Sequence, residues 1–344
     1  MDTSRKELQT RHGMKFLAAW LLFGVPSSLI ACAVGNLIGW NAVTVALLVV
    51  LIELSVVMSG VFCVAAKQAD ERMQMCFPLE TNEKGRAWIM KTIAICNHKG
   101  GVGKTALSMA FAEGLHSRGK RTLLVDLDQQ MNATQQAGVK TEDEVTVYDL
   151  LTSNEYKGHD AIKSYEYGDI IPGDTYVTNA ESEMTKLDTK LNMLDDALVD
   201  VDGYDYVIID CPPQLRLVTR NALVAADEVI VPVTPNTSAL KGFTNIFECV
   251  NSIKKNRHLN PNLRIAGIVV NMYDARTALS KEVMSTLPPV AEEAGTKVFK
   301  TVINKCEAVN RAQSEKVSIY EYDPKSKAVV DFNRFIDEYL EGEN

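Results

Sequence analysis

The chain has 344 residues, 46% of which are hydrophobic, and a formal net charge of −8 at pH 7. Its length allows two ordinary domains with buried cores, and its acidic balance excludes a broadly basic nucleic-acid-binding surface, so that any contact with DNA must be a local patch. Its seven cysteines include no Cys-x-x-Cys pair, which fits a reducing compartment and argues against a cysteine-based metal site.

The first part of the chain contains two long apolar segments, at residues 16–38 and 41–66, and Glu53 is the only charged side chain within them. As helices, which rise about 1.5 Å per residue, both segments are long enough to cross the roughly 30 Å hydrocarbon layer of a membrane. We therefore expect a two-helix transmembrane hairpin within residues 1–66, followed by a linker at residues 67–89. Basic residues flank the hairpin, which predicts a protein of the cytoplasmic membrane with both termini in the cytoplasm.

Two other interpretations of this part of the chain stay open. The segments could be buried helices of a soluble core, or residues 1–89 could come from a misassigned start codon, since Met90 opens a strand-like run. A protein that begins at Met90 would be cytoplasmic. If the hairpin does cross a membrane, Glu53 is costly in lipid, and we expect it to face the other helix or a neighbouring subunit.

A strand, a glycine-rich loop and a helix are predicted next. "KTIAIC" at residues 91–96 is rich in apolar residues, and apolar residues recur at helical spacing after the loop. The loop glycines would let backbone N–H groups turn toward phosphate oxygens, and the start of the helix adds a partial positive charge. Lys104 can reach the β and γ phosphates, and the Thr105 hydroxyl can ligate Mg²⁺. The candidate nucleotide-binding residues of this loop are Gly100, Gly101, Val102, Gly103, Lys104, Thr105 and Ala106.

Carboxylates follow two further strands, expected at residues 121–127 and 205–210. Asp126 and Asp128 are two residues apart, which would place them on one face of the first strand, at the end where parallel α/β sheets bind ligands. One of them can order the Mg²⁺ shell and the other the attacking water. Asp210 ends the second strand as a Walker B acid does. The candidate metal ligands are therefore Thr105, Asp210 and whichever of the two carboxylates does not orient water, which is Asp126 if Asp128 has that role. The alternative is that these aspartates only cap strands.

Three more strands are expected at residues 228–233, 264–270 and 297–303, with helices between them. Alternating strands and helices of this kind predict an α/β fold with a doubly wound, mostly parallel sheet. With the phosphate-binding loop, this makes residues 90–344 a P-loop NTPase domain.

The loop "KGGVGKT" resembles the deviant Walker A P-loop of the ParA/MinD group of ATPases. Five later blocks are similar to ParA-type partition proteins and occur in the same order: "LLVDLDQQMNAT", "YDYVIIDCPPQLRLVTRNAL", "VIVPVTPNTSALKG", "GIVVNMYDARTALSKEV" and "YEYDPKSKA". The resemblance covers about residues 90–340 and says nothing about residues 1–89. It implies an ATPase that needs Mg²⁺, forms a nucleotide-dependent homodimer and acts with a ParB-like activator protein.

The resemblance also implies roles for individual residues. Asp128 would orient the attacking water, and Lys99 would reach the nucleotide of the second subunit in a dimer. Lys104 and Asp210 complete this candidate catalytic set. Asn271 and Pro235 match positions that hold the adenine.

Weak, non-specific DNA binding is the implied property that this sequence supports least. Where the family usually has Ile-Pro-Arg-Asn-Val-Arg, the chain has Lys305 in place of one arginine and Ala308 in place of the other. Arg276 and Lys305 remain the candidate DNA-binding residues. Arg276 could instead be a surface residue that caps its turn.

The sequence therefore predicts a membrane-tethered ATPase switch of the ParA type, which acts in plasmid or chromosome partition or positions another cargo. One alternative is a bacterial tyrosine autokinase, which also pairs two membrane spans with a P-loop domain and has tyrosines near its C-terminus, as this chain has at Tyr320, Tyr322 and Tyr339. Another is a membrane adaptor in which ATP sets the dimeric state and turnover is negligible.

Overall fold

The computed structural model describes residues 90–187 and 190–343. The expected hairpin within residues 1–66 and the linker at residues 67–89 lie outside the described residues. Among the helices of the described part, none combines the length and the apolar character that crossing a bilayer requires.

An eight-stranded sheet runs through the described part, with the strand order β3-β4-β2-β5-β1-β6-β7-β8. All neighbouring strands are parallel except β3 and β4, which form an antiparallel pair. The strands are β1 (Lys91–Ile95), β2 (Thr122–Asp126), β3 (Lys163–Tyr165), β4 (Gly168–Ile171), β5 (Tyr206–Asp210), β6 (Glu228–Val233), β7 (Arg264–Tyr273) and β8 (Val298–Asn304). The six predicted strands and the mostly parallel sheet are confirmed.

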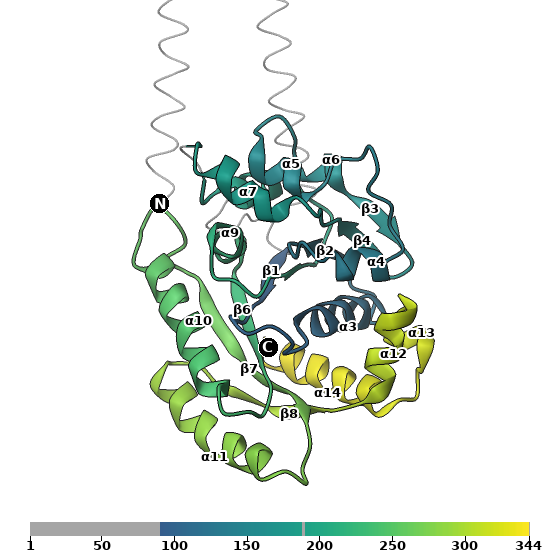
Figure 1. The fold of residues 1–344 in the computed structure, drawn as a ribbon, viewed down its shortest axis with the longest axis vertical. Coiled ribbons are helices and arrows are strands. Elements are labelled where there is room, and N and C mark those ends of the chain that lie inside the picture. The colour runs from purple at the N-terminus through teal and green to yellow at the C-terminus, as the bar shows by residue number, and fades with distance from the viewer. Residues whose placement is uncertain (1–89, 188–189, 344) are drawn as a thin grey trace, which may run out of the picture. The chain divides into compact units, whose positions relative to one another are not determined.

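Helices cover both faces of this sheet (Figure 1). They are α3 (Lys104–His116), α4 (Asn132–Gln136), α5 (Val147–Thr152), α6 (Gly158–Ala161), α7 (Val177–Met184), α8 (Met193–Leu198), α9 (Leu217–Ala225), α10 (Ala239–Lys254), α11 (Ala278–Glu293), α12 (Glu307–Glu315), α13 (Ile319–Tyr322) and α14 (Lys327–Glu341). The apolar core on one face includes residues of α3, α4 and α12 to α14, and the core on the other face includes residues of α5 to α11. Side chains alternate along β1 and just after it: Ile93 and Ile95 belong to the first core, and Ala94 and Cys96, the residue that follows the strand, belong to the second.

The C-terminal helix α14 packs directly on α3, the helix that follows the glycine-rich loop. Phe111 of α3 meets Tyr339 edge-on at 5.2 Å between ring centroids and Phe335 at 5.6 Å. Gly114 allows this close approach, because a Cβ at that position would lie 2.3 Å from Ile336 Cδ1. The last helix of the chain therefore fixes the helix that carries Lys104 and Thr105.

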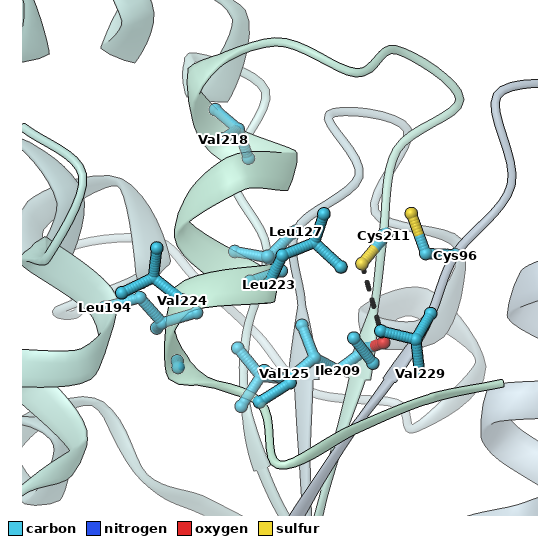
Figure 2. Packing of buried hydrophobic residues seen from close by; sticks show 14 of the residues in the cluster. Cys96, Val125, Leu127, Leu194, Ile209, Cys211, Val218, Leu223, Val224 and Val229 are labelled. Atoms are coloured by element: carbon cyan, nitrogen blue, oxygen red, sulfur yellow. Dashed lines mark hydrogen bonds between the residues drawn. The ribbon is translucent and has the colours of Figure 1, made fainter. Parts of the chain in front are cut away.

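Two cysteines lie in the apolar core at the carboxyl ends of the central strands β1 and β5. Cys96 follows β1 and Cys211 follows β5, and both are fully buried. Figure 2 shows the two sulfur atoms next to each other, among aliphatic side chains that include Leu127 and Val229. Burial raises the pKa of the Cys211 thiol well above its ordinary value. Both cysteines therefore serve as small apolar side chains here.

Candidate active site

The glycine-rich loop joins β1 to α3 at the carboxyl edge of the sheet. Gly101 and Gly103 adopt left-handed backbone conformations, with φ values of 72° and 80°, which residues with a Cβ rarely adopt. Lys104 is only 7% exposed, and its Nζ donates to the Lys99 carbonyl at 3.2 Å, so the lysine folds back along the loop. The side chains of Val102 and Ala106 are buried, which leaves only their backbone groups for a ligand. This local geometry suits an anion such as phosphate.

Asp210 is a buried carboxylate at the end of β5 that contacts the first turns of α3 through Ser108. Its Oδ1 accepts a hydrogen bond from Ser108 Oγ at 3.0 Å, while its Oδ2 is buried and has no partner among the described residues. Burial raises the pKa of Asp210, and the nearby Asp126 carboxylate raises it further; the Thr105 hydroxyl and the Lys104 charge act in the opposite direction. A buried carboxylate oxygen without a partner is costly, so this site fits a cation.

Asp126 is the register partner of Asp210 on the adjacent strand β2. Its Oδ2 accepts from Thr134 N at 2.9 Å and from Thr134 Oγ1 at 2.8 Å, and its Oδ1 accepts from Asp128 N at 3.1 Å. Burial raises the pKa of Asp126 to about 6 despite these bonds. The structure therefore places Asp126 beside Asp210. Both carboxylate oxygens of Asp126 accept hydrogen bonds from residues that follow β2.

Asp128 does not lie on the strand, contrary to our expectation. Because β2 ends at Asp126, the two aspartates do not share a strand face, and Asp128 belongs to the loop before α4. It is partly exposed, and its Oδ1 accepts from Gln130 N at 3.1 Å. A cavity of about 180 Å³ lies beside it, between this loop, α7 and the segment with Pro212 and Pro213. Asp128 can therefore reach water, as a water-orienting residue must.

Lys99 is tied to the loop that follows β6. Its Nζ donates to Ser238 Oγ at 2.9 Å, and its backbone N–H donates to Asn97 Oδ1 at 3.0 Å. Asn97 is buried and donates in turn to the Pro232 carbonyl at 2.6 Å. Pro235 lies in the same loop, between β6 and Ser238. Two segments far apart in sequence, the glycine-rich loop and the loop that follows β6, are thus joined at the site.

Asn271 also contacts the glycine-rich loop, from the end of β7. It is 4% exposed, and its Nδ2 donates to the Val102 carbonyl at 2.9 Å. This contact places Asn271 in the site as predicted, but the partner is the loop backbone. Whether Asn271 or Pro235 holds a base stays a prediction.

The two candidate DNA-binding residues lie at the same edge of the sheet. Arg276 is exposed, and its guanidinium donates twice to the Asp274 carboxylate, at 2.9 and 2.7 Å. These bonds, with a smaller contribution from the charge of Lys305, hold the pKa of Asp274 below its ordinary value. Lys305 is also exposed, and it follows β8. The structure therefore places Arg276 and Lys305 near one carboxylate, which partly neutralises the proposed patch.

Ser108, Thr134 and Asn97 belong to the site but are missing from the sequence prediction. Ser108 had a usable signal, because it follows Lys104 by four residues and so lies on the same face of α3. Thr134 and Asn97 act through contacts that only the folded chain creates.

Comparison with known proteins identifies the family. A family profile described as an AAA domain matches residues 90–265. The sporulation initiation inhibitor protein Soj of Bacillus subtilis (strain 168) is 41% identical over 241 residues, which cover 69% of this chain and 93% of Soj. The chain belongs to the ParA/Soj family of P-loop ATPases. The resemblance predicted from the sequence is thereby confirmed for the ATPase part of the chain.

Two further proteins are similar to this chain. The chromosome partitioning protein ParA of Myxococcus xanthus (strain DK1622) is 35% identical over 249 residues, which cover 71% of this chain and 86% of that protein. The structure of cobyrinic acid a,c-diamide synthase from Mycobacterium smegmatis, with a bound ATP analog and magnesium, is 28% identical and has a TM-score of 0.62. That alignment covers 72% of this chain and 93% of the synthase.

Membership of the ParA/Soj family argues against the tyrosine autokinase alternative, and so does the position of two tyrosines. Tyr339 is 3% exposed, and its hydroxyl donates to Glu228 Oε2 at 2.7 Å. The Tyr320 hydroxyl donates to the Ala110 carbonyl at 3.1 Å. Neither hydroxyl is free to accept a phosphoryl group in this structure.

Proposed function

We propose that the chain binds ATP with Mg²⁺ at the glycine-rich loop and hydrolyses it, and that this reaction switches the protein between two states. The observation that carries the proposal is the buried Asp210 Oδ2, which lacks a partner among the described residues and lies in a site with Lys104 and Thr105. A divalent cation bound there would stabilise that oxygen. The bound ATP analog and magnesium of the M. smegmatis relative support the same pair of ligands.

Each residue of the site suits one part of this task. The loop N–H groups and Lys104 would bind the phosphates, and Thr105 and Asp210 would hold Mg²⁺. A Mg²⁺ ion held there by Thr105 and Asp210 would neutralise part of the negative charge that develops on the phosphates during hydrolysis. Asp128 would orient the attacking water, and Asp126 would keep Asp128 in place through the bond to its N–H.

Two substitutions test these assignments in the full-length chain. Lys104→Ala should abolish ATP binding in calorimetry, because it removes the charge that meets the phosphates. Asp128→Ala should still bind ATP but release no phosphate, because only the orientation of water is lost. Lys120→Ala is the matched control, since Lys120 is exposed beyond the C-terminal end of α3. Unchanged ATP binding in Lys104→Ala, or unchanged turnover in Asp128→Ala, would reject the corresponding role.

We further propose that ATP drives homodimerisation and that a ParB-like protein activates hydrolysis, in partition of chromosome or plasmid DNA or in positioning of another cargo. The name of the M. xanthus relative supports a role in partition. The contacts of Lys99 support the dimer, because its ammonium group is held by the Ser238 hydroxyl rather than by a carboxylate. Lys99 can therefore swing toward a second subunit by giving up only the hydrogen bond to Ser238, without breaking an ion pair among the described residues.

The remaining proposals concern the membrane and DNA. The apolar segments at residues 16–38 and 41–66 support tethering of the ATPase domain to the cytoplasmic membrane. A protein that starts at Met90 would lack both segments and would not be tethered through them. DNA binding through Arg276 and Lys305 would be weak and non-specific, since the Asp274 carboxylate already pairs with Arg276.

A further inference from the structure

One buried serine joins helix α3 to the end of strand β5 inside the candidate active site. We propose that Ser108 is a positioning residue, which holds Oδ1 of Asp210 and so leaves Oδ2 for the Mg²⁺ ion that the site would bind. This role presupposes the ATP and Mg²⁺ site proposed above, in which Asp210 is one ligand of the metal.

The Ser108 hydroxyl lies within reach of two acceptors. Ser108 is fully buried, and its Oγ donates to Asp210 Oδ1 at 3.0 Å and to the Lys104 carbonyl at 3.0 Å. A hydroxyl has a single proton, so it serves one acceptor at a time. The Lys104 carbonyl lies four residues before Ser108, where a backbone N–H of an α-helix also donates. The Asp210 carboxylate therefore depends on this hydroxyl more than the carbonyl does.

Packing alone does not explain a serine at position 108. Ala106, Ala110 and Ala112 are also buried on α3, so small apolar side chains fit this part of the helix. Alanine is the better helix former, and a buried hydroxyl costs free energy unless it is hydrogen-bonded. Serine is therefore favoured here by a contact that alanine cannot make, and the bond to Asp210 is such a contact.

The bond to Ser108 decides which oxygen of Asp210 stays free. The torsion that turns a carboxylate is broad and roughly two-fold, so without a fixed partner the two oxygens can exchange places. With Oδ1 bound to Ser108, Oδ2 is the oxygen that is buried without a partner among the described residues. The Thr105 hydroxyl also interacts with this carboxyl group, but it is itself a candidate metal ligand. Ser108 can keep its bond while Thr105 turns to the metal.

The same bond joins the two elements that carry the candidate metal ligands. Ser108 follows Thr105 by three residues, so both lie on one face of α3. Asp210 ends β5, 102 residues after Ser108. Residues that hold a metal ligand in place commonly change metal affinity by about ten- to hundredfold when they are replaced. Loss of the Ser108 hydroxyl should therefore weaken the binding of Mg²⁺ and leave the contacts of the loop with the nucleotide intact.

Calorimetry on the full-length chain tests this role by comparing the affinity for ATP in Mg²⁺ with that in EDTA. The wild type should bind ATP more tightly with Mg²⁺, and Ser108→Ala should reduce this gain by about tenfold without changing the affinity in EDTA. Ser117→Ala is the matched control, because Ser117 is exposed at the end of α3 and also donates to a helix carbonyl, that of Gly114, at 2.8 Å. It should change neither affinity. An unchanged gain in Ser108→Ala, or an equal loss in Mg²⁺ and in EDTA, would overturn the proposal.

A second substitution separates the hydrogen bond from the volume of the side chain. Ser108→Cys keeps nearly the same size but replaces the hydroxyl with a weak donor, so it should lose the Mg²⁺ gain as Ser108→Ala does. A cysteine variant with the wild-type gain would count against the role of the hydroxyl. If the wild-type chain itself binds ATP equally well with Mg²⁺ and with EDTA, or does not bind ATP, the proposed function fails, which is a different result from any of these.

Discussion

Replacing Glu113 with glutamine should stabilise the protein at alkaline pH and much less at acidic pH. Glu113 lies on α3 and is 1% exposed; its Oε2 accepts from Ser318 Oγ, and its Oε1 has no partner among the described residues. Burial raises the pKa of Glu113 to about 7, and the Ser318 bond opposes this rise, while the charges of Glu166 and Glu321 add to it. The ionised form is therefore disfavoured in the folded state.

The change in the free energy of unfolding follows from the difference between the pKa of Glu113 in the unfolded and in the folded state. A carboxyl group whose pKa is higher in the folded state contributes stability that is fully present below its unfolded pKa and is lost as the pH rises through its folded pKa. For Glu113 this window runs from 4.5 to about 7. The wild-type protein therefore loses about 1 kcal/mol of its free energy of unfolding at pH 5 and about 3 kcal/mol at pH 8 through this group. Glutamine is neutral throughout and keeps an oxygen for Ser318, so Glu113→Gln should gain roughly these amounts over the wild type.

Urea unfolding followed by circular dichroism between pH 5 and pH 8 would measure this difference. Asp126 also has a raised pKa, about 6, but it titrates in both proteins and cancels in the comparison. Glu142→Gln is the control, because Glu142 is exposed. A free-energy difference between wild type and Glu113→Gln that does not change with pH would refute the assignment of a raised pKa to Glu113.

Three other predictions concern the assembly, the membrane and DNA. Lys99→Ala should keep ATP affinity but lose the ATP-dependent dimer in light scattering; the same dimer in the variant would exclude a role across subunits. The full-length chain should fractionate with membranes, and a 90–344 fragment should be soluble and still bind ATP. A native N-terminus at Met90 in mass spectrometry, or an N-terminal reporter that is active outside the membrane, would contradict the hairpin. DNA binding should need ATP, ignore sequence and fall steeply with salt, because contacts to phosphates release counterions. A variant with Arg276→Glu and Lys305→Glu that binds DNA with an unchanged salt slope would place the patch elsewhere.

The central strands could be predicted from the sequence because they are buried on both faces. Strands β5 and β6 are buried at every residue, so apart from Asp210 at the end of β5 and Glu228 at the start of β6 they appear as continuous apolar runs. The edge strand β3 and its neighbour β4 are absent from the sequence prediction. The three residues of β3, "KSY", are only partly buried or exposed, and its pairing with β4 is an antiparallel hairpin at the sheet edge. Nothing in so short a polar segment distinguishes a strand from a loop.

In the candidate active site, residues that belong to a contiguous motif could be predicted from the sequence, whereas contacts between distant segments could not. The glycine-rich loop and Asp210 could be predicted because the first is a contiguous motif and the second ends an apolar run. The support of Asp126 by Thr134, and of the loop by Asn271, could not be predicted, because each joins segments that only the folded sheet brings together. The two-residue spacing of Asp126 and Asp128 was misleading because the strand ends between them.

The packing of α14 on α3 sets an order of events during protein synthesis. Phe111 of α3 is made early, whereas its partners Phe335 and Tyr339 belong to the last helix of the chain. At about 5–20 residues per second, a ribosome needs roughly ten to forty-five seconds to make the segment between them. During that interval the apolar face of α3 has no C-terminal helix to cover it. A premature stop codon near the end of the gene would therefore leave every residue of the glycine-rich loop in place and still expose the helix on which Lys104 and Thr105 depend.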